Sequence, residues 1–272
     1  MKGAFVVFRS ILALILALLC LFCPVSCAEK EEVISEEALE YFNKGLSAFN
    51  IADCKSSMRA YAILKDAQSG QTVNGYLLYT ENFYKNEGHT GSRKSETYYG
   101  YSKTPDQLLP ASLTHFSTSY RKDDQVYYEH LKEHKKYRVA LSEDYSSAMG
   151  LYSLGSGVPQ GTYGVKGGGT VRADLIFDSK TCEKLQAVLI YNMKSALLGS
   201  DAQMTCSPLT VSAHINEKDN RFTGYTLTFT GNTEISGKAY RLSFHYEEVF
   251  FDYDTKEEIA FPADLDTYEK LK

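Results

Sequence analysis

The strict alternation of apolar and polar residues in the second half of this sequence restricts its fold more than any other feature. In "PLTVSAHI", residues 208–215, apolar and polar residues alternate, and in "YTLTFT", residues 225–230, threonines separate Tyr225, Leu227 and Phe229. Successive side chains of a strand point to opposite faces, so a period of two gives a sheet with one apolar face. Such one-sided burial is typical of antiparallel sheets. The sequence therefore predicts a mainly β, antiparallel fold.

The next alternating stretch, residues 240–253, changes phase in its middle. Its apolar residues fall first on even and then on odd positions: Tyr240, Leu242, Phe244, Tyr246, Val249, Phe251 and Tyr253. A slip of one residue inside a long strand indicates a β-bulge or a sharp bend. We therefore expect the sheet to be strongly curved.

Residues 35–50, "SEEALEYFNKGLSAFN", form the clearest helix candidate. Ser35 suits the N-cap position, and the two glutamates after it complement the helix dipole. Glu40 and Lys44 are ordered for an i,i+4 ion pair. The apolar residues recur at helical spacing: Leu39, Phe42, Leu46 and Phe49. This helix therefore has one apolar stripe that another element must cover.

The rest of the chain contains about eleven strand candidates separated by turn residues. The 21 Tyr and 14 Phe, with no Trp, also favour strands. An arc of about eleven strands is wider than a closed eight-stranded barrel and encloses space. The predicted fold is thus mainly β (α+β): a strongly curved antiparallel half-barrel with the helix at 35–50 packed on its concave face.

The first 27 residues have the features of a secretory signal: two basic residues, an apolar run and an exit of small residues. The sequence "PVSC" before and including Cys27 resembles the lipobox at which bacterial lipoproteins are lipidated, although Pro24 stands where Leu is usual. Ser26 and Ala28 alternatively fit ordinary cleavage before Glu29, which would give a secreted protein. We expect an exported protein, lipid-anchored through Cys27 at the extracytoplasmic face of the bacterial cell membrane.

The remaining sequence suits one domain. We divide the chain into the signal segment 1–27, a polar tether 28–34 and a single domain 35–272, with a Gly-rich loop at 149–170. Removal of residues 1–26 moves the formal charge from −5 to −7. A mildly acidic domain has no electrostatic footprint for nucleic acid. The expected partners are a hydrophobic ligand, the membrane surface and an envelope protein.

Signatures of catalysis or metal binding are weak. His130 and His134 have the spacing of two ligands on one helical face, but their segment reads as a hairpin tip, and no third ligand is apparent. The sequence lacks G-x-S-x-G, and the carboxylates of "EEVFFDYD", residues 247–254, are interpreted as an acidic strand edge. We therefore predict no enzyme activity, no metal and no cofactor.

Beyond Cys27 the exported chain has three cysteines, Cys54, Cys182 and Cys206, so at most one disulfide can form among them. A Cys182–Cys206 bridge and buried free thiols are both open interpretations.

Several segments resemble the LolA-like superfamily of envelope lipoproteins and lipoprotein carriers. After the candidate lipobox and helix come the strand "SSMRAYAIL", the hairpins "QVYYEHLKEHKKYRVAL" and "LIFDSKTCEKLQAVLIYNM", and the ending "VFFDYDTKEEIAFP". The resemblance implies a bent antiparallel half-barrel whose concave side binds lipids or lipidated proteins. Some members of this family sense rather than carry.

We expect a hydrophobic ligand, a lipid or an acylated molecule, to bind on the concave apolar face. The predicted ligand-binding residues are Leu39, Phe42, Leu46, Tyr225, Leu227, Phe229, Leu242 and Phe244. The alternatives are an envelope interaction or sensing module with a filled core and no small-molecule ligand, and a surface hydrolase.

Overall fold

The computed structural model describes residues 32–85, 91–140, 158–180, 197–198 and 204–271. The predicted signal segment 1–27, including Cys27, lies outside the described residues. Of the predicted tether 28–34, Glu32 and Val33 pair with the edge of the sheet and Ile34 is buried. The division of the chain into these segments stays a prediction.

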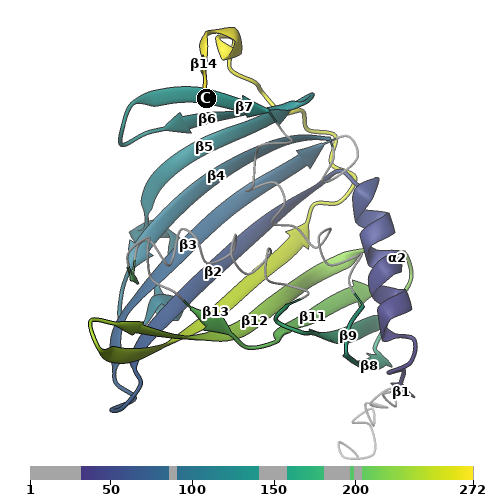
Figure 1. The fold of residues 1–272 in the computed structure, drawn as a ribbon. Coiled ribbons are helices and arrows are strands. Elements are labelled where there is room, and N and C mark those ends of the chain that lie inside the picture. Colours follow the sequence, from purple (N-terminus) through teal and green to yellow (C-terminus); the bar gives the residue numbers. More distant parts are fainter. Residues whose placement is uncertain (1–31, 86–90, 141–157, 181–196, 199–203, 272) are drawn as a thin grey trace, which may run out of the picture.

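The described residues form one large, curved and unclosed sheet of fourteen strands with one α-helix, α2 (Ala38–Asn50), as Figure 1 shows. The strands are β1 (Glu32–Val33), β2 (Cys54–Asp66), β3 (Thr72–Lys85), β4 (Ser92–Tyr101), β5 (Thr114–Lys122), β6 (Gln125–His130), β7 (Lys135–Ala140), β8 (Gly161–Gly167), β9 (Thr170–Phe177), β10 (Thr205–Cys206), β11 (Leu209–Asn216), β12 (Phe222–Ile235), β13 (Lys238–Phe251) and β14 (Glu269–Lys270). The mainly β prediction is confirmed.

The sheet order is β1-β8-β9-β11-β12-β13-β2-β3-β4-β5-β6-β7-β14, and β10 also pairs with β12. Its long strands pair in antiparallel fashion, and β14 pairs with β7 in parallel. The expected count of about eleven strands is too low because four of the fourteen strands were not predicted: β8, and β1, β10 and β14, which are two residues long and too short to show any period. The predicted strand at 184–195 lies outside the described residues.

The interpretation of residues 149–170 as a Gly-rich loop is wrong for its second half. Residues 161–167 form β8, which pairs with β9. Gly168 and Gly169 connect the two strands with φ of 61° and 74°, a left-handed conformation that glycine adopts at little cost. Several of the other glycines lie within the strand itself, where composition alone gave no strand signal. Residues 149–157 lie outside the described residues.

The bulge expected within residues 240–253 is absent. Strand β13 pairs with β12 and with β2 without a register shift. Instead, Glu248 and Phe250 continue the buried face, while Val249 and Phe251, 42% and 43% exposed, point to the opposite face. The sequence pattern was misleading because a buried carboxylate interrupts the apolar series. Register shifts do occur elsewhere, at Leu64/Lys65, Thr97/Tyr98 and His214/Ile215.

Helix α2 begins three residues later than predicted. Its N-cap is Glu37, which makes no side-chain capping bond, so the assignment of Ser35 as N-cap is wrong. The predicted ion pair is present, with Lys44 Nζ 2.8 Å from Glu40 Oε1. Phe42 and Phe49 pack on the sheet, as the apolar stripe predicted. We call the sheet face against which α2 packs the inner face, and the opposite one the outer face.

The predicted hairpin at 125–141 is confirmed as β6 and β7. After β13, residues 252–271 run along the ends of the strands to reach β7 (Figure 1), and we call this segment the C-terminal strap. At its start Asp254 forms two 2.7 Å contacts with Arg221, and the Tyr253 hydroxyl donates to the Phe222 carbonyl over 2.7 Å. Further on, the buried strap residues pack on the outer-face side chains of β5 and β6: Ile259, Leu265 and Tyr268 against Tyr120 and Tyr127.

Candidate functional site

The predicted ligand-binding residues all belong to the hydrophobic core of the inner face. Seven of them are buried, and Leu39 is partly buried and packs against the others. The seven are Phe42, Leu46, Tyr225, Leu227, Phe229, Leu242 and Phe244. That they bind a ligand stays a prediction.

These residues nevertheless lie in two separate areas of the inner face. Phe42 of α2 packs edge-on against Phe222, with ring centroids 5.8 Å apart, whereas Phe229 stacks on Phe244 at 4.6 Å. Phe222 and Phe229 are seven residues apart along β12, or roughly 23 Å at about 3.3 Å per residue. The helix therefore covers one end of the wall only. Sequence analysis missed Phe222, because the residue stands at the start of its strand, outside the alternating run.

A buried carboxylate stands between these two areas. Glu248 is only 4% exposed, and both of its carboxylate oxygens accept hydrogen bonds from neutral side chains of four strands. The donors are Ser56 Oγ (2.5 Å), Asn82 Nδ2 (3.4 Å) and Tyr84 Oη (3.1 Å) to Oε1, and Tyr225 Oη (2.8 Å) and Tyr246 Oη (2.9 Å) to Oε2. Five donors use essentially the whole accepting capacity of a carboxylate.

This arrangement corrects the interpretation of residues 247–254 as an acidic strand edge. Glu247 and Asp252 are exposed, as that interpretation requires, but Glu248 points to the inner face. A buried carboxylate is tolerated only when it is hydrogen-bonded, and here the hydroxyl and amide donors supply those bonds. The signal was present in the sequence: Tyr246, Glu248 and Phe250 are two residues apart, so a continued alternation places Glu248 on the same face as the two aromatic residues.

Burial keeps the groups around Glu248 protonated. Burial first, and then the negative charge of Glu248, raise the pKa of Tyr84, Tyr225 and Tyr246 well above the usual value for a phenol. The same two causes raise the pKa of the Cys54 thiol to about 12. Because reactivity requires the thiolate, Cys54 is a buried, inert thiol. This cluster therefore organises the wall and offers no nucleophile at neutral pH.

The inner face changes character from one side of the sheet to the other. On β9, β11 and β12 it is apolar, with buried residues such as Leu175, Val211 and Leu227. On β3, β4 and β5, beside core residues such as Leu78, it also carries hydroxyl, amide and guanidinium groups. The buried ones are Thr80, Asn82, Ser95, Ser117, Ser119 and Arg121. The Glu248 cluster lies at the boundary, since Asn82 Oδ1 also accepts a 2.7 Å hydrogen bond from Ser95 Oγ.

The cysteines and histidines considered for a disulfide or a metal site do not form one. Cys54 and Cys206 are free, so the Cys182–Cys206 bridge is not formed, and Cys182 itself lies outside the described residues. His130 ends β6 and His134 lies in the following turn rather than on a helix. In the part of the chain that the structure describes, no group of three His, Cys, Asp or Glu side chains could hold a metal ion.

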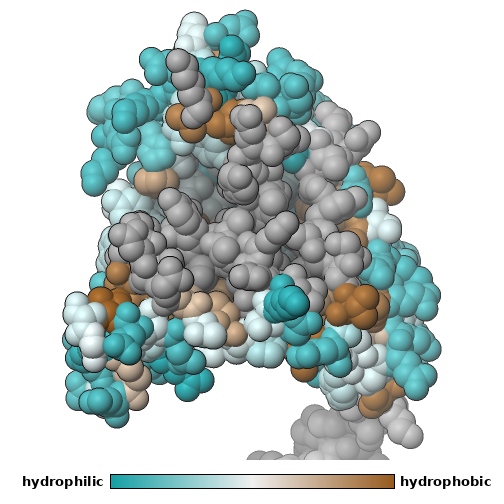
Figure 2. Space-filling view, viewed as in Figure 1, coloured by the Kyte–Doolittle hydropathy of each residue, from teal (hydrophilic) through white to brown (hydrophobic). Residues whose placement is uncertain are grey.

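Large hydrophobic residues are exposed singly rather than as one surface. Figure 2 shows a mainly hydrophilic described surface on this side, with hydrophobic residues in small separate patches. The most exposed ones include Ile51 and Val158, both at 81%. Isolated exposed apolar residues are normal for a folded domain. Among the described residues, no helix is both long and apolar enough to cross a bilayer.

These features define a mainly β protein in which a single described helix packs on the inner face of a large, curved, unclosed sheet. No protein-family model matches the chain, and no curated protein shows significant sequence similarity to it. Detectable similarity is limited to solved structures.

One such structure, of lipid–protein interactions in lipovitellin, has a TM-score of 0.37 and 7% identity, over 79% of this chain and only 27% of the lipovitellin chain. The LolA superfamily protein NE2245 from Nitrosomonas europaea has a TM-score of 0.27 and 8% identity, over 83% of this chain and 96% of its own. A β-barrel-like protein of unknown function from Brucella abortus has a TM-score of 0.23 and 9% identity, over 72% and 98%. All three TM-scores are low.

No family model matches the chain, and the LolA superfamily structure has a low TM-score. The resemblance of the sequence to the LolA-like superfamily therefore stays a prediction.

Proposed function

We propose that this protein binds a hydrophobic ligand, a lipid or an acylated molecule, on the inner face of its sheet. The observation that carries the proposal is the change in polarity across this face, from apolar side chains on β9, β11 and β12 to hydroxyl and amide groups on β3, β4 and β5. An amphiphile has the same division, with a tail that is stabilised by apolar contact and a headgroup that needs hydrogen bonds. The stacked pair Phe229 and Phe244 is the proposed tail contact.

The proposal includes location and the absence of catalysis. The chain is exported and held at the membrane surface by a lipid on Cys27, and the protein is not an enzyme. The apolar run and small-residue exit before Cys27 support the first part. The hydrogen-bond saturation of Glu248 and the protonated state of Cys54 support the second.

Mass spectrometry of the protein purified from its own host tests the proposal. The mass of the protein is measured under native and under denaturing conditions. Extra mass that is present only under native conditions identifies a bound ligand. Acyl chains on Cys27 in the denatured mass establish the anchor, whereas an unmodified chain that begins at Glu29 makes the protein freely secreted. If the native and denatured masses are equal, ligand binding is rejected, whether or not Cys27 carries a lipid.

A negative charge at the proposed tail contact tests where the ligand binds. Phe229→Glu is expected to abolish the co-purifying ligand, because a carboxylate in an apolar wall disfavours an acyl chain. Thr223→Glu places the same charge at an exposed position of β12 and should retain the ligand. Thermal unfolding of both variants identifies loss of the fold, in which case Phe229→Thr is the milder replacement. A folded variant with unchanged ligand content would contradict the assignment of Phe229.

One observation favours the alternative of an envelope interaction or sensing module with a filled core. Seven of the eight predicted wall residues are already buried within the protein, and Phe42 is fully buried. A protein of this kind would show no native-only mass and would instead crosslink to a partner protein in the envelope. The same purification therefore separates the two functions.

A further inference from the structure

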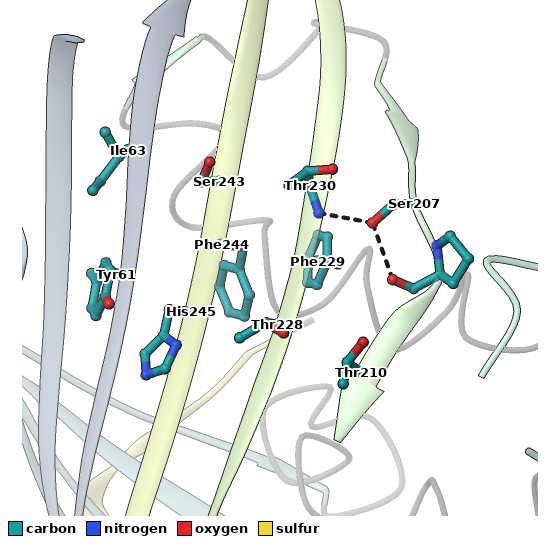
Figure 3. A pocket seen from close by; sticks show the side chains of 11 residues that line it. Tyr61, Ile63, Ser207, Thr210, Thr228, Phe229, Thr230, Ser243, Phe244 and His245 are labelled. Carbon is teal, nitrogen blue, oxygen red and sulfur yellow. Dashed lines mark hydrogen bonds between the residues drawn. The ribbon is translucent and has the colours of Figure 1, made fainter. Parts of the chain in front are cut away.

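A depression of about 450 Å³ lies on the outer face, across β2, β13, β12 and β11 (Figure 3). This volume lies within the range of about 300–1,000 Å³ that is typical of small-molecule sites. The register of the sheet aligns its floor in two cross-strand rows. One row is Tyr61, His245, Thr228 and Thr210, and the other is Ile63, Ser243 and Thr230.

The connection between β10 and β11 forms one wall of the depression. The Ser207 hydroxyl donates to the Pro208 carbonyl over 3.0 Å and accepts a 2.9 Å hydrogen bond from the backbone N–H of Thr230. Figure 3 shows both bonds and the position of Ser207 beside the floor. These contacts fix the wall against β12, so the depression is built into the fold.

The described residues of the lining are uncharged and rich in hydroxyl groups. None of the eleven lining residues is Asp, Glu, Lys or Arg. Within the described part of the chain, the hydroxyls of Thr210, Thr228, Thr230 and Ser243 have no hydrogen-bond partner. Burial lowers the pKa of His245 below its usual value of 6.5, so its imidazole is neutral at neutral pH. Each hydroxyl can therefore donate and accept for a ligand, and no charge selects an ion.

The aromatic side of the lining completes the chemistry. Tyr61 and His245 stack with ring centroids 4.8 Å apart and together form a rigid π surface at the end of the first row. The faces of such rings carry negative potential and attract the positive edges of C–H groups. Among the residues that the structure describes, the flanking rows carry the nearest charged side chains of these strands: Lys65 with Arg241, and Arg59 with Glu247.

We propose that the outer-face depression binds a neutral carbohydrate. A sugar presents hydroxyls that can each donate and accept, and C–H groups that pack on aromatic rings, which are the two kinds of contact that the lining offers. A hydrocarbon chain would leave the hydroxyls without partners, and a charged ligand would meet no opposite charge. The two floor rows lie on the face of the sheet opposite to the proposed lipid site, although Phe229 and Phe244 of the proposed tail contact also line the depression.

Titration calorimetry and saturation-transfer NMR of the full exported chain test this site. The neutral probes are maltotriose and the trisaccharide of N-acetylglucosamine, and the charged probe is a trisaccharide of galacturonic acid. We expect one of the neutral sugars to bind and the charged one not to bind. Absence of binding by both neutral sugars at millimolar concentration, or tighter binding of the charged sugar, would overturn the proposal.

Two matched variants locate the binding. Thr228→Phe fills the depression and is expected to weaken binding at least tenfold. Thr226→Phe changes the same residue type on the same face of β12, one row away and outside the lining, and should leave affinity unchanged. If Thr228→Phe does not fold, Ser243→Val removes a lining hydroxyl with less added volume and is expected to weaken binding. Equal affinities of the wild-type protein and the depression variant would place the sugar elsewhere.

Discussion

The carboxylate of Glu248 receives hydrogen bonds from side chains of β2, β3, β12 and β13. Among these strands, β2 and β13 are the first and last long strands along the chain, and they pair with each other in the middle of the sheet. One side chain thus fixes the positions of three tyrosine rings on the inner face. Because every donor is neutral, the carboxylate depends on all of them for the solvation that it loses on burial.

Replacement of Glu248 by Gln should lower the free energy of unfolding by about 1–3 kcal/mol, since the charge-assisted bonds become ordinary ones. Replacement by Leu should cost more, about 3–5 kcal/mol, because it leaves several buried donors without an acceptor. Urea unfolding measures both changes. Glu247→Gln on the exposed side of the same strand is the control and should be close to neutral. A Leu variant as stable as the Gln variant would show that the donors find other partners.

His245 gives the protein a pH-dependent contribution to stability. Burial is the main cause of its lowered pKa, with Arg59 acting in the same direction and Glu247 against it. Below the usual pKa of 6.5 the unfolded chain binds a proton that the folded protein takes up less readily. The free energy of unfolding should therefore decrease as the pH falls below about 6.5, and the decrease should end below the lower pKa of the folded protein. His245→Gln should remove this slope in urea titrations, and an unchanged slope would assign it to another group.

At the scale of elements, the packing of α2 depends on a glycine. A Cβ at Gly45 would lie 2.7 Å from the Phe222 ring, which is closer than atoms of this kind pack. Gly45→Ala should therefore destabilise the protein by about 1–3 kcal/mol, although alanine is the better helix former. Ser47→Ala on the exposed side of the helix is the control and should be neutral or slightly stabilising. The double variant Gly45→Ala with Phe222→Leu removes the clash and should be more stable than the sum of the two single effects predicts. Thermal unfolding measures all three variants.

The docking of the C-terminal strap should weaken slightly at low pH. The hydrogen bond from Lys136 lowers the pKa of Asp264 below its usual 3.8. This pair therefore stabilises the docked strap above pH 3.8 and loses its effect as the pH falls through the lower folded pKa. The protection of residues 264–271 against hydrogen exchange, relative to an unstructured chain, should decrease there. Lys136→Gln should have the same effect at about neutral pH. Lys135→Gln is the control, because Lys135 pairs with Glu133 of its own hairpin.

Elements with a clear period were the ones that the sequence could predict. The alternation identified β11, β12 and most of β13, and the 3.6-residue stripe identified α2. Prediction failed where another interaction replaces apolar burial. Glu248 is buried by hydrogen bonds, and β8 is held by pairing with β9 despite its glycines. The residues predicted to bind a ligand do lie in the core of the inner face, but neither the Glu248 cluster nor the outer-face depression was predicted, because both depend on which strands are neighbours.

At the scale of the whole molecule, the proposed functions use opposite faces of one sheet, and this separation can be measured. Phe229 points to the inner face and Thr228, its neighbour in β12, to the outer face. Because Phe229 also lines the depression, Phe42→Glu is the cleaner variant: it should remove the co-purifying ligand without changing sugar affinity, and Thr228→Phe should have the reverse effect. Native mass spectrometry and calorimetry on the same two variants provide the comparison. Loss of both activities in either variant would indicate global disruption rather than two sites.

The pairing of β13 with β2 has a consequence for how the chain reaches its native state. It joins Lys55 to Phe251 and Asp66 to Tyr240, so the centre of the sheet unites segments from opposite ends of the described chain. Strands β2 to β7 form one local meander, and β8, β9, β11, β12 and β13 another. Contacts between distant segments carry a large loop-closure cost and form slowly. Synthesis must therefore be nearly finished before the two meanders can join, so the sheet is completed late.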